Sequence, residues 1–433
     1  MFPRWMLLLS ALMALSAGTA TAQRFHYVVP PDHPASVSPD GSADAPWQGV
    51  DAALEAAKGG DIILLNDGAY GALRLRNVMF DLPVLIQSLN GKNAHFDFIW
   101  IDGESRNLSF RNLSVWKDTD ATTQYQSLVQ SGADTAWLTF EGLDIRGRGA
   151  EADSYLTWTA DEWREAQSAV LLRGDDSLVR DCLIRGVGMG IALSGDRSEA
   201  VGNFIEGFAG DGLRAIGDFN RLAGNFVMNN VVVDENHDDG IQSWATEGAV
   251  RALVIEGNRI FEWTGPEAHP LRGPLQGIGL FDGFFDGLTI RNNLVEVSAW
   301  HGISVYGGRG VDIVNNTVVP RASEGASLPW IGVFAHKNGV EARDVRVANN
   351  VAPRFNMKPD ASRNILYRNN FRLIAVELSF ADPVAGDFRP REGSALIDAG
   401  DADLAPPADI DGVLRRMHGA PDIGAFELAS GSE

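Results

Sequence analysis

The fold of this chain is indicated by a repeat that is clearest in residues 182–227, which read CLIRGVGMGIALSGDRSEAVGNFIEGFAGDGLRAIGDFNRLAGNFV. Two phrases alternate in this stretch. One is an Asn followed by apolar residues, as in Asn203-Phe204-Ile205 and Asn225-Phe226-Val227. The other is a Gly followed by an aliphatic residue, as in Gly190-Ile191 and Gly212-Leu213. Each phrase returns after 22 residues, so the stretch indicates one structural unit repeated along the chain.

Both phrases continue far beyond this stretch. The first recurs at Asn112, Asn203, Asn225, Asn258, Asn293, Asn316, Asn350 and Asn370, with Gly142 and Cys182 in the same place. The second recurs at Gly190, Gly212, Gly240, Gly277, Gly302 and Gly332. Short alternation of apolar and polar residues after these phrases predicts strands, with Gly and Asn at the turns between them.

A strand that returns every 20-odd residues cannot bury its apolar face alone. Its copies must therefore stack about 4.8 Å apart, as in a parallel β-helix. The asparagines are expected to adopt a left-handed conformation and to hydrogen-bond to their copies, forming an internal ladder. Cys182, in the same column, is expected to be a buried core residue. The predicted fold is all-β.

The net charge limits the classes of binding partner, and the cysteine content limits the means by which the fold can be stabilised. The formal net charge is −21, so nucleic acid and anionic membranes are poor partners. An acidic polysaccharide remains open only if local basic groups or bridging cations offset this charge. The single Cys excludes an intramolecular disulfide, so stability must come from the stacked core. We expect a monomer with no transmembrane segment.

The first residues have the pattern of a signal peptide. Arg4 precedes an apolar stretch from Trp5 to Ala17 that is too short to span a bilayer, and Ala20-Thr21-Ala22 resembles a cleavage site. This pattern predicts a periplasmic or secreted protein that begins near Gln23. Periplasm and extracellular space are equally open.

The two ends carry a family resemblance. A helix is expected over residues 47–58, and its segment Ala52–Asp61 is similar to the start of chondroitinase B and related alginate lyases. Residues 394–400, 409–412 and 421–427 resemble the terminal segment common in bacterial β-helix proteins. Over residues 26–427 the chain resembles the secreted right-handed parallel β-helix superfamily of polysaccharide lyases, epimerases and polygalacturonase-type hydrolases. This predicts a signal peptide at 1–22, an N-terminal strand and capping helix at 23–72, the β-helix at 73–372, and a C-terminal cap and tail at 373–433.

The longer repeats place their extra residues at one corner. From an Asn phrase to the next Gly phrase, the short coils take 8 or 9 residues, whereas 225–240, 258–277 and 316–332 take 15, 19 and 16. Stacked loops at one corner would form a wall beside a flat sheet, and therefore a groove for a ligand. A further insertion near 150–167, with Tyr155, Trp158 and Trp163, is expected to cover this groove.

Alternation predicts which side chains face the groove. If Ile241 points inward, then Gln242 and Trp244 point outward. The same register predicts a set of outward-facing side chains that are candidate substrate-binding residues. These are Arg214, Gln242, Trp244, Phe281, Tyr306 and His336, to which Arg272 on a long loop is added. Aromatic side chains on successive coils would offer stacking faces for sugar rings.

The richest segment for chemistry is Asp234–Gln242, which reads DENHDDGIQ. Asp211 occupies the equivalent place one coil earlier and His301 two coils later. Asp commonly caps turns, but the clustering favours a catalytic site. The candidate catalytic residues are Asp211, His237, Asp238, Asp239, His301 and Lys337. Because Asp239 lies at a turn near solvent, Asp239→Asn is expected to abolish activity with little loss of stability.

Two phrases partly resemble those of polygalacturonase-type hydrolases, namely Asn236–Ile241 and Trp300–Ser304. The paired-Asp motif that those enzymes carry in the coil between is absent, since that coil reads Leu275–Leu280. Their basic R-I-K phrase is absent too, with Ala335-His336-Lys337 roughly in its place. The Lys and Arg catalytic phrases of chondroitinase B and the D-P-H phrase of mannuronan epimerases also have no counterpart.

Three functions remain open. A polysaccharide lyase, or a related epimerase, would remove the C5 proton of a uronic acid with His237, His301, Tyr306 or Lys337 as base. Arg214, Arg272, or a Ca²⁺ ion held by Asp211, Asp238 and Asp239, would neutralise the sugar carboxylate. An inverting glycoside hydrolase would use Asp239 with Asp211 or Asp238 as acid and base. The third possibility is a non-catalytic glycan-binding solenoid. In each case the partner is a polysaccharide or oligosaccharide.

Overall fold

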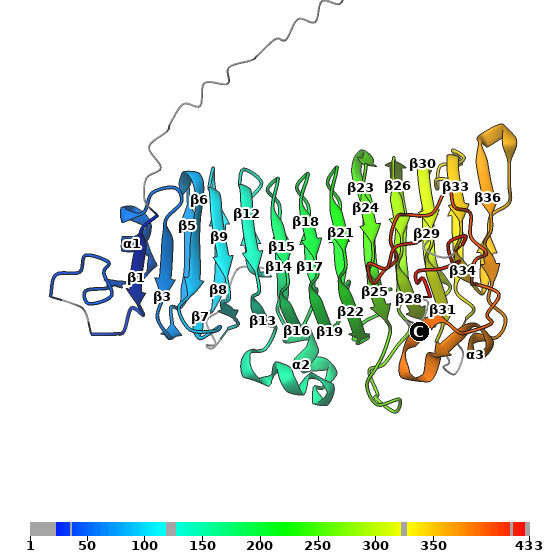
Figure 1. The fold of residues 1–433 in the computed structure, drawn as a ribbon. Helices are drawn as coiled ribbons and strands as arrows, with labels where there is room; N and C mark the ends of the chain where they lie inside the picture. Colours follow the sequence, from blue (N-terminus) through cyan, green and yellow to red (C-terminus); the bar gives the residue numbers. More distant parts are fainter. Residues whose placement is uncertain (1–22, 35–36, 118–126, 322–326, 416–418, 429–433) are drawn as a thin grey trace, which may run out of the picture.

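The chain winds into a long right-handed parallel β-helix, which confirms the predicted fold (Figure 1). The computed structural model describes residues 23–34, 37–117, 127–321, 327–415 and 419–428. The expected signal peptide at 1–22 lies outside these residues. Each coil contributes up to three strands, and each strand pairs in parallel with its counterparts in the neighbouring coils. Three columns of strands therefore run along the molecule.

The first column holds β5 (Ala72–Arg76), β8 (Phe98–Asp102), β11 (Ser127–Ser131), β14 (Ser168–Leu172), β17 (Ile191–Leu193), β20 (Leu213–Ala215), β23 (Asp239–Arg251), β26 (Gln276–Asp286), β29 (His301–Tyr306), β32 (Trp330–Phe334) and β35 (Arg354–Asn356). The second holds β1 (Phe25–Val29), β3 (Ile62–Leu65), β6 (Met79–Ser88), β9 (Arg106–Arg111), β12 (Ala136–Glu141), β15 (Leu178–Arg180), β18 (Glu199–Val201), β21 (Arg221–Ala223), β24 (Val254–Glu256), β27 (Thr289–Arg291), β30 (Gly308–Val314), β33 (Arg343–Ala348) and β36 (Ile365–Arg368). The third holds β4 (Gly68–Ala69), β7 (Ala94–Phe96), β10 (Ser114–Val115), β13 (Asp144–Arg146), β16 (Leu183–Val187), β19 (Phe204–Phe208), β22 (Phe226–Asn230), β25 (Arg259–Phe261), β28 (Leu294–Val297), β31 (Thr317–Pro320), β34 (Val351–Ala352) and β37 (Phe371–Arg372).

Few other elements flank the coils. They are β2 (Trp47–Gln48), α1 (Val50–Ala56), the 3₁₀ helix η1 (Gly149–Thr157), α2 (Ala160–Glu165), η2 (Ala361–Arg363), α3 (Val376–Ser379), β38 (Phe380–Asp382), η3 (Pro383–Ala385) and β39 (Asp387–Pro390). The N-terminal helix is shorter than the predicted 47–58, because Trp47 and Gln48 pair with β1 as a strand instead. None of the helices in the described ranges has the length and apolarity needed to cross a membrane.

The interior is one continuous column of apolar side chains. In the first column Ile191, Leu213, Ile241, Ile278 and Ile303 stand on successive rungs, and all are 0% exposed. Each of these residues follows the Gly of the second sequence phrase, so that phrase marks the start of an inward-facing strand. The hydrophobic effect therefore fixes which face of every strand in this column points inward.

The predicted asparagine ladder is confirmed. The Asn225 side-chain amide donates to Oδ1 of Asn258 over 2.9 Å, and the Asn258 amide donates in the same way to Asn293 over 3.0 Å. The pattern runs from the backbone N–H of Cys182, which donates to Asn203 Oδ1, to Asn370. Cys182 is buried at the start of this column, as expected. Each amide thus satisfies a backbone group inside a dry core.

The left-handed residues lie one position before the ladder, which corrects the expectation that the ladder asparagines adopt this conformation. Gly224, Gly257 and Asn292 have φ of 63°, 65° and 53° and precede ladder asparagines. Asn112 and Gly142, with φ of 51° and 64°, belong to this earlier column and not to the ladder. The turn needs one residue of positive φ, and Gly or Asn adopts it at least cost. The next residue is then free to direct its amide along the stack.

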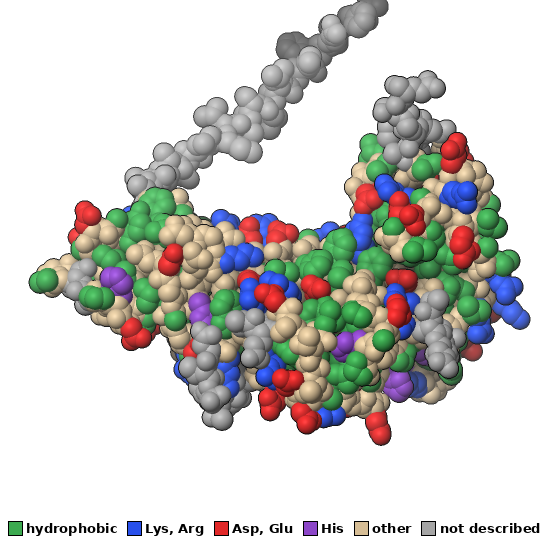
Figure 2. Space-filling model, turned by 90° about the horizontal axis from the view of Figure 1, so that it is seen from below, with side chains coloured by type: hydrophobic (Ala, Val, Ile, Leu, Met, Phe, Trp, Pro, Cys, Tyr) green, Lys and Arg blue, Asp and Glu red, His purple; other side chains and the backbone are tan. Residues whose placement is uncertain are grey.

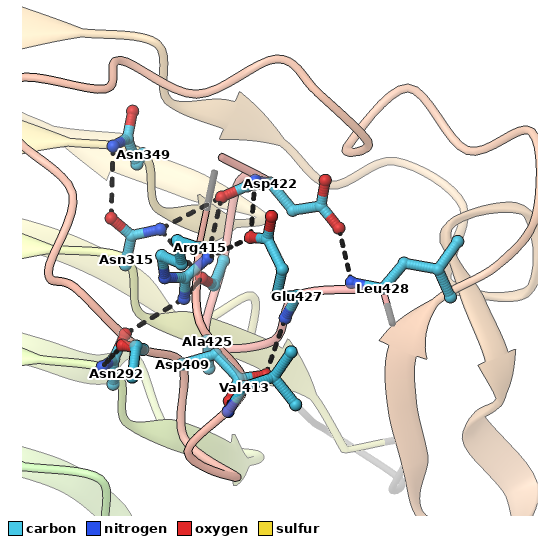
Figure 3. Close-up of polar contacts among 12 residues, drawn as sticks. Asn292, Asn315, Asn349, Asp409, Val413, Arg415, Asp422, Ala425, Glu427 and Leu428 are labelled. Carbon is cyan, nitrogen blue, oxygen red and sulfur yellow. Dashed lines mark hydrogen bonds and ion pairs between the residues drawn. The ribbon is translucent and has the colours of Figure 1, made fainter. Parts of the chain in front are cut away.

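The C-terminal segment is fastened to three asparagines of this left-handed column (Figure 3). Arg415, whose side chain is 1% exposed, donates to Asn292 Oδ1 over 3.1 Å and to the carbonyl of Gly424 over 2.8 Å. Asn315 donates to the carbonyl of Gly424, and Asn349 donates to that of Asp401. The segment after β37 therefore folds back along the coils and ties three of them together.

The insertion near 150–167 supports the wall of loops and does not cover the groove with exposed aromatic residues. Tyr155, Trp158 and Trp163 are buried and pack with Val231 and Trp263, which lie on the long loops of two later coils. In Figure 1 this insertion, with α2, and the loop between β25 and β26 both project from the lower edge of the β-helix. The sequence showed aromatic residues in an insertion but not the loops that bury them.

The ladder predicts a large effect from a single interior amide. In Asn258→Ala, the amide of Asn225 and its backbone N–H would lose their acceptor inside the core. We expect the free energy of unfolding to fall by about 2–3 kcal/mol, measured by chemical denaturation. Asn338→Ala, at an exposed turn, is the control and should change it by less than about 0.5 kcal/mol. Equal stability of the two variants would contradict a stabilising role for the ladder.

Candidate functional site

A cavity of about 540 Å³ opens at the corner where the long loops stack. We call it the site pocket. Its walls include His237, Glu262, Arg272, Gln276, Trp300 and His301. These residues come from the loops before β23, β26 and β29 and from the first residues of β26 and β29. Figure 2 looks onto this lower side of the molecule and shows histidine side chains set among hydrophobic and acidic ones.

The structure brings the three predicted acids together. The backbone N–H of Asp239 donates to Asp211 Oδ1 over 3.1 Å, and Arg214 Nε donates to Asp211 Oδ2 over 3.0 Å. We call Asp211, Asp238 and Asp239 the acid cluster. Their exposed fractions are only 1%, 3% and 1%. The expectation that Asp239 lies near solvent is therefore wrong.

A glycine in the next coil explains how Asp239 is buried. A Cβ at Gly279 would lie 2.4 Å from Oδ1 of Asp239 and 2.3 Å from Cε2 of Phe281. Only Gly leaves space there, so both the carboxyl group and the ring lie over this residue. None of the acid cluster lines the site pocket, but the backbone carbonyl of Asp238 accepts the N–H of Gln276, which does line it. The acids thus lie directly behind the pocket wall.

Burial changes the protonation of the acid cluster. It raises the pKa of Asp239 to about 9, with the charge of Asp211 adding to the effect and the hydrogen bond from Gln242 opposing it. Burial, followed by the charges of Asp211 and Asp234, raises the pKa of Asp238 to about 7. The pKa of Asp211 is also raised by burial, with Arg214 opposing. At neutral pH, Asp239 therefore keeps its proton.

The acid cluster does not suit the expected calcium site. Within the described ranges, no group of three or more His, Cys, Asp or Glu residues is arranged to hold a metal ion. Arg214 occupies one carboxylate oxygen of Asp211, and the backbone N–H of Asp239 occupies the other. Calcium prefers several charged oxygen ligands, so we derive no step of the chemistry through this ion.

Two residues of the site pocket are suited to act on an anionic substrate. His301 Nδ1 lies 2.9 Å from Ser304 Oγ, and burial lowers the pKa of His301, with His237 adding to the effect. The imidazole is therefore neutral at pH 7. Arg272 forms an ion pair of 2.6 Å with Glu267, yet its Nε and Nη2 are buried without a hydrogen-bond partner in the described part of the chain. Buried N–H groups without an acceptor are costly, and Arg272 also lines the site pocket, so its guanidinium is a candidate for binding a carboxylate.

Glu262 was not identified from the sequence. It is 1% exposed, and its Oε2 accepts the backbone N–H groups of Leu275 and Ser298 and the hydroxyl of Ser298 over 2.7–3.0 Å. It thereby joins the loops of two coils at the back of the site pocket. No motif marks it, because its partners are backbone groups whose position depends on how the loops stack. Trp300 and Gln276 were also missed as site residues.

The other predicted residues lie outside the site pocket. Lys337 forms an ion pair of 2.5 Å with Asp282, and His336 stacks on Phe284 at a second cavity, which is also lined by the second half of β23. Trp244 carries the guanidinium of Arg214 at 4.6 Å from its ring centroid. Phe281 and Tyr306 lie beside each other, with ring centroids 5.9 Å apart.

One strand register was misplaced in the sequence reading. Gly332 pairs with Ser304 and not with Gly302, since Ile331 is the partner of Ile303. The position before Ile331 is occupied by Trp330, so this coil lacks the glycine that marks the others. His336 consequently falls beyond the end of β32, at the next turn.

The raised pKa of Asp239 has a consequence for stability. An unfolded Asp loses its proton near pH 4, whereas folded Asp239 keeps it up to about pH 9, so this residue destabilises the fold as pH rises across that window. Asp239→Asn should therefore raise the free energy of unfolding by about 1–3 kcal/mol at pH 8 and leave it nearly unchanged at pH 4. Denaturation at both pH values measures this. A destabilised variant at pH 8 would show that Asp239 is ionised in the fold.

Three comparisons place the fold among known proteins. Residues 152–318 match the family described as "Right handed beta helix region". A search of curated proteins gave no match. The crystal structure of pectate lyase Pel9A is similar over 94% of this chain and 97% of its own, with 17% identity and a TM-score of 0.52. A rhamnogalacturonan lyase is similar over 86% of this chain and 94% of its own, with 15% identity and a TM-score of 0.49. The A-module of mannuronan C-5 epimerase AlgE6 from Azotobacter vinelandii is similar over 75% of this chain and 90% of its own, with 13% identity and a TM-score of 0.45. The chain is a right-handed parallel β-helix protein.

Proposed function

We propose that this protein is a polysaccharide lyase that cleaves a glycan containing uronic acids, with the reaction taking place in the site pocket. One observation carries the proposal: Arg272, two of whose N–H groups make no hydrogen bond to a described residue, lines the same cavity as the neutral imidazole of His301. The fold shared with a pectate lyase is consistent with this class of substrate. Export by the predicted leader, which would bring the protein to such glycans, is part of the proposal.

The two residues would divide the chemistry between them. Arg272 would bind the sugar carboxylate and so stabilise the negative charge that develops when the C5 proton is removed. His301 would take that proton through Nε2, which makes no hydrogen bond to a described residue, while Nδ1 is held by Ser304. Electrons from the C5–H bond form the C4–C5 double bond, and the C4–O bond breaks. His237, exposed at the pocket, would return a proton to the departing oxygen.

The acid cluster would help an anionic substrate to approach. The protein carries a net charge of −21, which repels a polyuronate. Because Asp239 is protonated at neutral pH and Asp238 about half protonated, the cluster behind the pocket carries much less negative charge than three carboxylates would. In this mechanism Asp239 needs only to be neutral and does not touch the substrate.

An inverting glycoside hydrolase is the second candidate. The observation that favours it is the pKa of Asp238, which at about 7 suits a general acid. Against it stands the burial of the acids: a hydrolase needs two carboxyl groups beside the scissile bond, whereas Asp238 and Asp239 are 3% and 1% exposed.

The first test concerns the proposed base and the carboxylate-binding residue. We expect wild-type protein to release products with the ultraviolet absorbance of an unsaturated uronate from polygalacturonate or alginate. His301→Ala should lower kcat by about 100-fold or more, and Arg272→Ala should raise KM as well. Arg251→Ala, at the end of β23 and outside the site pocket, is the matched control. Product formation that stops with EDTA would show that a metal is needed, contrary to the mechanism above.

Asp239→Asn separates the two reactions. The lyase should keep most of its activity, because the amide is neutral like the protonated acid, and the decline in rate above about pH 9 should disappear. If the protein is instead a hydrolase, Asp239→Asn should lose activity. The wild-type hydrolase would then yield reducing ends without ultraviolet absorbance, and the variant would yield neither. The pH–rate profile and the product spectrum of both proteins decide between these outcomes.

A further inference from the structure

Six rings form a continuous aromatic platform next to the site pocket. They belong to Phe281, Trp300, His301, Tyr306, Trp330 and Phe334, on or just before β26, β29 and β32. Neighbouring ring centroids lie 4.7–6.3 Å apart: 4.9 Å for Phe281 and His301, 5.9 Å for Phe281 and Tyr306, 4.7 Å for Tyr306 and Phe334, 6.3 Å for Trp330 and Phe334, 5.1 Å for His301 and Trp330, and 6.1 Å for Trp300 and Trp330. Rings from three coils therefore make one surface.

Small residues allow these rings to lie against the sheet. A Cβ at Gly332 would approach Cζ of Phe334 to 2.6 Å, and one at Gly279 would approach the ring of Phe281 to 2.3 Å. Gly279, Ser304 and Gly332 pair with one another across the three strands. Ser304 Oγ also accepts a hydrogen bond of 2.9 Å from Trp330 Nε1. The rings thus fold back over a row of small residues. Those of Tyr306 and Phe334 are nearly parallel, at 23°, whereas the other neighbouring pairs meet at 40–81°. All six rings are at least partly exposed to solvent.

The platform lies on only one side of the acid cluster. The coils before it carry Ala192, Arg214 and Gln242 in the row that Gly279, Ser304 and Gly332 continue. The aromatic residue nearest to that side, Trp244, has a ring face covered by the guanidinium of Arg214. At the far side of the platform, the exposed Arg354 lies 5.5 Å from the ring centroid of Trp330 and makes no ion pair with a described residue.

We propose that the aromatic platform binds the sugar units that extend from the site pocket toward the C-terminal coils, so that the substrate is held on one side of the reaction centre. A pyranose ring presents an apolar C–H face that packs on an aromatic ring, while its hydroxyl groups stay in water. Arg354 would pair with a uronate carboxylate beyond Trp330. This inference rests on the proposed function, because it assigns the substrate of that pocket.

Binding of polymers, measured apart from turnover, tests the platform. We would measure the affinity of the full chain for polygalacturonate and for alginate by electrophoresis in native gels that contain the polymer. Phe334→Ala should weaken binding about three- to tenfold. Gly332→Ala should do the same, because the added Cβ would displace the Phe334 ring without removing it. The matched control is Phe219→Ala, which removes another exposed aromatic side chain, far from the platform at the turn after β20. It should bind as the wild type does.

The outcomes separate this inference from the proposed function. Unchanged binding by both platform variants, in a protein that binds and cleaves a polyuronate, would overturn the platform alone. Weakened binding by both variants, without any product from the wild type, would support the platform and overturn the lyase. A wild type that binds neither polymer would overturn both. An equal loss in Phe219→Ala would also reject the platform, since the effect would not be specific to it.

Discussion

The site of this protein depends on the vertical register of its coils. Buried amides of the asparagine ladder join each coil to the next over 2.9–3.0 Å, and inward-facing aliphatic residues stack on the opposite side of the same interior. A shift of one residue in any strand would turn its apolar side chains outward and leave the amides unpaired. Because both penalties are large, each coil has one position. Residues that are 62 positions apart, such as Asp239 and His301, therefore reach the same corner of the stack.

Loops added to this rigid stack create the cavity, and burial creates its chemistry. Glu262 joins two loops through backbone N–H groups, and Trp263 packs with the insertion that carries Trp158 and Trp163. These contacts hold the wall in place without using Arg272 or His301. Behind the wall the acids are removed from water, and this burial is the largest cause of the raised pKa of Asp238 and Asp239. In the proposed mechanism, the reduced negative charge of the cluster and the guanidinium of Arg272 together favour an anionic ligand.

Sequence reasoning was most accurate where one residue type serves one purpose. Apolar residues after the recurring glycines correctly marked inward-facing strands, as Ile241 and Ile278 show. It failed where a residue type serves two purposes. Asn occurs both at the left-handed turn position and in the ladder, so Asn112 was placed in the wrong column. It also failed where the marker glycine is absent. Trp330 stands in place of that glycine, so the predicted pairing of Gly332 was wrong by two residues.

The sequence by itself determined the stacked fold, the corner that carries the long loops and the group of acids that meets there. These follow from spacing and alternation, which are local properties that stacking preserves. Only the tertiary structure decided that Asp239 is buried and protonated, that Lys337 is paired elsewhere and that Arg272 and His301 line the same cavity. Solvent exposure and hydrogen-bond partners depend on residues from several coils at once, so no single repeat encodes them.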